Sequence, residues 1–137
     1  MAAKQTVYQI HVPPVLMING VAISTSPSCI LSTEGFNHLE IEVDTAWASA
    51  TNVRMVVETS QDVSGTPTWR AMQAIESAGS GAYTSYDFTL TKTVAAADHW
   101  VWHIDVNSNA VKLTFTNPAA NAGAGDTITI GVKKGVV

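Results

Sequence analysis

The chain has 137 residues, of which 46% are hydrophobic and only 13% charged, and its formal net charge is −4. This length fits a single domain with one hydrophobic core, and the scattered acids, with Lys133–Lys134 as the one basic cluster, argue against a nucleic-acid partner. No apolar run approaches the roughly 20 residues of a membrane helix. The single cysteine, Cys29, cannot form an internal disulfide and is expected to be a small buried residue.

The first fourteen residues are set apart from the rest by the Pro13–Pro14 pair. Their apolar positions are interrupted by His11 and the prolines, so a signal peptide is not expected, and the chain should fold in a cytoplasm. Two adjacent prolines favour a stiff, extended backbone. Residues 1–14 are therefore either the first strand of the fold or an arm that leaves the body and pairs with something else.

Alternation of apolar and polar residues predicts strands along most of residues 15–137. Residues 15–23, VLMINGVAI, form either one strand kinked at Gly20 or a hairpin that turns at Asn19–Gly20. Further strands are predicted within residues 37–45, 51–60, 82–90, 111–116 and 126–132. The residues expected to face the core are Leu39, Ile41, Val43, Val53, Met55, Val57, Val111, Leu113, Phe115, Ile128, Ile130 and Val132.

Turn-forming clusters at residues 26–28, 65–67, 77–81 and 117–125 separate these strands. Short strands with turns roughly every ten residues are typical of β-sandwiches and jelly rolls. We therefore predict an all-β protein whose residues 15–137 form a single antiparallel β-sandwich or jelly roll of roughly eight strands. Two stretches are ambiguous: residues 68–77 favour a strand starting at Trp69 over a helical turn, and residues 95–97 could form one turn before the next strand.

The stretch DHWVWHIDV, residues 98–106, places His99 and His103 four residues apart. On a helix this spacing would suit a metal site, but the aromatic and β-branched residues favour a strand. In a strand the two histidines are about 13 Å apart, too far for one ion bound at about 2 Å, so no metal is predicted. The strand places Trp100 and Trp102 on one face, either in the core or, with Trp47 or Trp69, as a platform for a sugar ring.

Enzymatic activity is not expected. Glu40, Glu42 and Asp44 share a strand face, but the most economical interpretation is a solvated face paired across to Arg54. The sequence contains no G-x-S-x-G nucleophile motif and no phosphate-binding loop. No catalytic residue and no cofactor is therefore predicted.

Three stretches together resemble small β-sandwich virion proteins of tailed bacteriophages, of the head decoration or cement type. They are ETSQDVSGTPTW (58–69), with a Ser-x-Asp turn leading to a Trp, WHIDVNSNAVKLTFT (102–116), and the closing turn and strand NAGAGDTITIGV (121–132). The resemblance covers about the C-terminal two-thirds of the chain. It implies a structural protein that stabilises a phage head from the outside. A tail or fibre subunit of such virions, or a carbohydrate-binding sandwich, are the alternatives.

The resemblance further implies the partner and the location. The major capsid protein is the expected partner, the protein is expected to be a homo-oligomer with a trimer favoured, and it would be assembled in the host cytoplasm onto the capsid surface. The N-terminal third lies outside the resemblance, and from the Pro13–Pro14 break we expect residues 4–12 to add a strand to a capsid protein or a neighbouring subunit. Tyr8, Ile10 and His11 are the predicted contacts.

Overall fold

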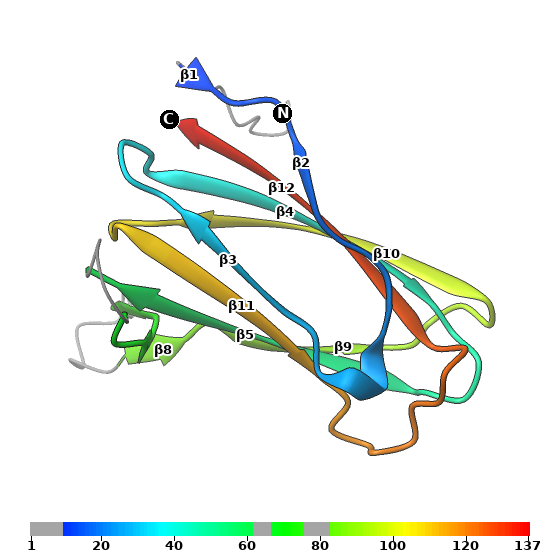
Figure 1. Ribbon diagram of the computed structural model, residues 1–137. Helices are drawn as coiled ribbons and strands as arrows, with labels where there is room; N and C mark the ends of the chain where they lie inside the picture. The colour runs from blue at the N-terminus through cyan, green and yellow to red at the C-terminus, as the bar shows by residue number, and fades with distance from the viewer. Residues whose placement is uncertain (1–9, 62–66, 76–82) are drawn as a thin grey trace, which may run out of the picture.

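The computed structural model describes residues 10–61, 67–75 and 83–137. They form two antiparallel sheets packed face to face, together with a short two-stranded ladder and one 3-10 turn (Figure 1). The strands are β1 (Ile10–His11), β2 (Val15–Ala22), β3 (Ser28–Ser32), β4 (His38–Ala46), β5 (Asn52–Ser60), β6 (Arg70–Ala71), β7 (Gln73–Ile75), β8 (Tyr83–Ser85), β9 (Asp87–Thr91), β10 (Ala97–Asp105), β11 (Ala110–Thr116) and β12 (Thr127–Val136), and the turn is η1 (Ile23–Thr25). The predicted all-β sandwich is confirmed.

The strand order makes the sandwich a jelly roll. In the first sheet the order is β2-β12-β4-β10, with β1 beside the end of β12, and in the second it is β3-β11-β5-β9, with β6 beside the end of β5. The chain passes from one sheet to the other between β2 and β3, β3 and β4, and β4 and β5. It does so again at each step from β9 to β12, which is the interleaved connectivity of a jelly roll.

The core lies between the two sheets and consists of the side chains that alternation assigned to it. Every residue predicted to face the core from β4, β5, β11 and β12 is at most 3% exposed. Because successive side chains of a strand point to opposite faces, one apolar row from each strand suffices to fill the space between the sheets. Cys29 is buried in β3, also as predicted.

The structure settles the three ambiguous stretches. Residues 15–22 form one strand rather than a hairpin, with Gly20 in the left-handed region at φ +60° and two irregularities in the pairing of β2 with β12. These bulges absorb the extra residues of β2 and let the strand follow its neighbour. Residues 70–75 form β6 and β7, and Val94 to Ala96 form a bend instead of a helical turn. The predicted strand at 82–90 is interrupted at Tyr86, between β8 and β9.

Candidate partner-binding site

Strands β2 and β3 form one open side of the sandwich. Within the described residues β2 pairs only with β12, and β3 pairs only with β11, so each has an outer backbone edge without a strand partner. The two strands belong to different sheets and are joined through η1 (Figure 1). Unpaired edges are templates for the addition of a further strand, and natural β-proteins usually protect them with charges, prolines or bulges.

The two edge strands and the residues next to them carry no charged side chain. Residues 12–33, which include both edge strands, contain no Asp, Glu, Lys or Arg, and we call them the uncharged edge. Four of the seven large hydrophobic residues that are exposed in the described part of the chain lie here: Val15, Leu16, Val21 and Ile30, at 37% to 57% exposure. Such a concentration of exposed apolar side chains is typical of a surface that another molecule covers.

A groove of about 220 Å³ opens between the two edge strands. It is lined by Val12, Pro13, Val15, Met17, Leu31, Ser32, Val132 and Lys134. Lys134 is the one charged lining residue, and its ammonium donates a 3.0 Å hydrogen bond to the backbone oxygen of Ser32 and lies 5.1 Å from the ring centroid of Phe36. Its charge therefore has local partners, and the groove is otherwise suited to apolar side chains.

The predicted contacts of the N-terminal segment lie next to this groove or outside the described residues. Tyr8 belongs to residues 1–9, which the structure does not describe. The backbone of Ile10 and His11 pairs with Val136 and Gly135 of β12 in the same chain. A further 2.9 Å hydrogen bond joins the amide of Val12 to the carbonyl of Lys134. Residues 10–12 therefore already have one backbone edge occupied by their own sheet.

The outer face of the first sheet carries histidines and acids as separate pairs. His99 Nδ1 bonds to a carboxylate oxygen of Asp44 on the neighbouring strand β4. His103 Nδ1 lies 3.0 Å from Nε2 of His38, a buried residue whose own Nδ1 lies 3.3 Å from Asp105. The two histidines of DHWVWHIDV thus have different partners, as expected for a strand.

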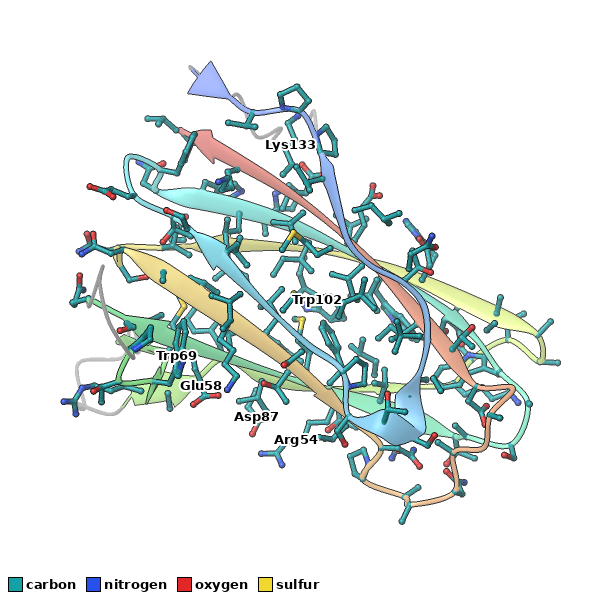
Figure 2. The ribbon with its side chains drawn as sticks, viewed as in Figure 1. Arg54, Glu58, Trp69, Asp87, Trp102 and Lys133 are labelled. Atoms are coloured by element: carbon teal, nitrogen blue, oxygen red, sulfur yellow. The ribbon has the colours of Figure 1, made fainter. Side chains whose placement is uncertain are left out.

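The predicted pairing of the β4 acids with Arg54 is wrong. Arg54 lies in the second sheet, where its guanidinium makes hydrogen bonds of 2.8 and 2.5 Å to both carboxylate oxygens of Asp87 on β9 (Figure 2). The side chains of Glu40, Glu42 and Asp44 face solvent on the first sheet instead. The error arose because adjacent strands in the sequence, β4 and β5, belong to different sheets.

The tryptophans of β10 face the sandwich interior, as the strand prediction requires. Trp100 meets Trp47 edge to face, at 6.4 Å between ring centroids, and Trp102 packs against Phe88 at 5.6 Å. Both side chains are half-buried against the core, and Trp102 is labelled in Figure 2. Trp69 differs, because its partly exposed ring lies on the second sheet with the ammonium of Lys112 5.9 Å from its centroid.

Cys29 lies buried in β3. Burial, partly offset by a hydrogen bond with the backbone of Leu113, raises the pKa of the Cys29 thiol to about 11, so the thiol is protonated at neutral pH. In the described ranges, no three residues of the His, Cys, Asp and Glu types are placed to hold a metal ion together. The same ranges contain no helix with the length and hydrophobicity needed to cross a bilayer.

Comparison with known proteins adds no relative. No protein-family model matches the chain, and the search of curated proteins finds no match. The uncharged edge must therefore be interpreted from its own chemistry. A signal for it was present in the sequence, as the long run without charge from Val12 to Thr33, but only the topology shows that both strands of this run lie at sheet edges.

Proposed function

We propose that the protein is a structural virion protein that binds the outside of a tailed-phage capsid as a head decoration or cement protein and stabilises the shell. The observation that carries this proposal is the uncharged edge, an apolar surface of two unpaired strands on an otherwise well-packed domain. Charges are one means by which a domain that works alone in solution protects such edges, and neither β2 nor β3 carries any. This surface is suited to a protein that functions within an assembly.

The fold and the composition support the same function. Jelly rolls are common in viral capsid proteins, although lectins share the architecture, so the fold is support rather than proof. A charged share of 13% is about half that of ordinary soluble domains. A surface of hydroxyls and amides can be buried against a lattice with less desolvation of charges.

The N-terminal segment supplies a second element of the proposed contact. Residues 10–12 pair with the end of β12 along one backbone edge. Residues 4–12, with Tyr8, Ile10 and His11 as contacts, are proposed to add a strand to the major capsid protein or to a neighbouring subunit. The assembly we propose is a homo-oligomer, with a trimer favoured, that forms in the host cytoplasm and remains on the capsid surface.

The decisive experiment is binding to a shell. The gene should lie beside that of a major capsid protein, and the purified protein should co-sediment with expanded capsids formed from that capsid protein. Binding should saturate at a fixed number of copies per capsid and raise the temperature at which the capsid dissociates. If the protein remains in the supernatant at saturating concentrations, the head-decoration function is overturned, whereas binding to isolated tails or fibres would move it to the alternative position in the virion.

A carbohydrate-binding sandwich is the second candidate, and Trp69 is the observation that favours it. Its half-exposed ring lies among charged side chains, with Lys112 next to it and Glu58 opposite Lys112 on the neighbouring strand. Aromatic rings with polar neighbours are a common surface for stacking of sugars. Binding to a glycan array that is lost in Trp69→Ala would favour this function, and Trp102→Ala tests the core-facing ring in the same way.

A further inference from the structure

We propose that the uncharged edge binds a second copy of this chain, whose N-terminal residues 1–9 add a strand along β3 and fill the groove between β2 and β3. This inference deepens the proposed function, because it assigns the N-terminal segment to a neighbouring subunit. It also stands without the capsid, since every contact that it names lies in this chain.

The acceptor is β3 together with the groove. The five residues of β3 pair in regular register with β11, and the opposite edge of β3 has no strand partner among the described residues. The groove between this edge and β2 is lined by Val15 and Met17 from β2 and by Leu31 from β3. Leu16 of β2 pairs with Gly131 of β12, and Ile30 of β3 pairs with Lys112 of β11. The side chains of Leu16 and Ile30 remain exposed beside the groove. An added strand would find backbone hydrogen bonds and apolar contacts together.

The donor has the required length and composition. Nine residues in extended conformation span about 30 Å, whereas β3 has five residues to cover. Residues 1–9, MAAKQTVYQ, contain Lys4 as their one charged side chain and offer Val7 and Tyr8 as adjacent apolar residues, one for each face of a strand. Val7 and Tyr8 of this segment can enter the groove, in which Lys134 already has local partners, without burying an unpaired acid or base.

The direction of β1 favours a second copy over the same chain. Val12 lies beside Lys134 of β12, and Ile10 lies beside Val136 at the end of that strand. The β12 residues that line the groove are Val132 and Lys134, which precede this end. Between Val12 and Ile10 the chain thus leads away from its own groove. A neighbouring subunit can receive it without reversing this direction.

Charge also favours self-association at this edge. Each copy has a net charge of −4, so two copies approach most easily where neither presents acids. The opposite edge strand of the first sheet, β10, carries Asp98 and Asp105, and its neighbour β4 presents Glu42 and Asp44. The uncharged edge has no such groups. A segment of one copy in the groove of the next is a heterologous contact, which closes into a ring such as the trimer that we favour.

The test compares the full chain with three variants by sedimentation velocity, without capsids. We expect the full chain to form a closed oligomer at micromolar concentration, and both Val15→Lys and a chain lacking residues 1–9 to sediment as monomers. Val101→Lys is the matched control, since Val101 is exposed to 43% on β10 where Val15 is exposed to 49% on β2. This control should sediment like the full chain. Circular dichroism and thermal unfolding verify that all variants are folded.

A mixing experiment distinguishes the segment from other modes of self-association. The chain lacking residues 1–9 keeps its groove, and Val15→Lys keeps its segment, so an equimolar mixture should form a heterodimer although neither protein associates alone. The proposal is overturned if the full chain is monomeric up to about 100 µM, if the deletion leaves the oligomer intact, or if the mixture shows no complex. Capsid binding by a monomeric chain would overturn this inference and leave the proposed function in place.

Discussion

The carboxylate of Asp126 accepts a 2.9 Å hydrogen bond from the backbone amide of Ala50, a residue 76 positions away in the chain. The same carboxylate accepts backbone hydrogen bonds from Ala48 and Ser49 in the loop after β4, and from Gly123 in the loop before β12. Asp126 itself is completely buried. Although burial acts in the opposite direction, these hydrogen bonds hold the pKa of its carboxyl far below the ordinary value. One ionised side chain thus joins two loops at one end of the sandwich.

Asp126→Asn should therefore destabilise the fold. The amide nitrogen of asparagine would face backbone donors that now meet a carboxylate oxygen, and hydrogen bonds to a charged acceptor each contribute about 1.5–3 kcal/mol. We expect the free energy of unfolding in urea to fall by about 2–4 kcal/mol. Asp87→Asn is the control, because that carboxylate forms an exposed pair with Arg54 and its loss should change stability by less than about 1 kcal/mol. Equal effects of the two substitutions would contradict this role of Asp126.

Stability should decrease in acid, and Asp98 should contribute to the decrease. Burial raises the pKa of Asp98, but hydrogen bonds from Thr93, the indole of Trp47 and the amide of Val94 outweigh it and lower the pKa from 3.8 to about 2. A carboxyl whose pKa is lower in the folded state stabilises it above the unfolded pKa, and this contribution is lost as the pH falls from about 4 to about 2. Urea midpoints measured across this range should fall less steeply in Asp98→Asn than in the wild type. Parallel curves would show that Asp98 is not coupled to folding.

The strands could be predicted from the sequence because each shows its own alternation of apolar and polar residues. Which strands pair with one another could not be predicted in this way. The local pattern alone was enough to predict the core-facing rows of β4 and β11, and all six of their side chains are fully buried. These residues are Leu39, Ile41 and Val43 of β4 and Val111, Leu113 and Phe115 of β11. The partner of Arg54 and the anchoring of two loops by Asp126 depend on which strands meet across the sheets. Such contacts join residues far apart in the chain and leave no period in the sequence. Residues 62–66, within the stretch 58–69 that supported the phage resemblance, and Tyr8 lie outside the described residues.

His99 should titrate above its ordinary pKa. The hydrogen bond with Asp44 raises the pKa of His99 above 6.5 although burial acts in the opposite direction, and the charges of Asp44 and Glu42 add smaller upward contributions. In NMR titrations of the imidazole C2 proton, Asp44→Asn should lower the His99 midpoint toward 6.5 more than Glu42→Gln does. Because the folded-state pKa is raised, the associated stabilisation is present below about pH 6.5 and is lost as the pH rises through the folded-state pKa. A midpoint that Asp44→Asn leaves unchanged would refute the pairing.

Cys29 should be inert to thiol reagents as long as β3 stays on β11. The side chain is 9% exposed, and burial raises the pKa of its thiol to about 11, so little thiolate is present at pH 8. Reaction with an aromatic disulfide reagent should be at least a hundredfold slower in the native protein than in guanidinium chloride. Because β3 is an edge strand, slow native labelling would report its local detachment. If residues 1–9 of a second copy cover this edge, their deletion should accelerate the labelling, while Val101→Lys should leave the rate unchanged.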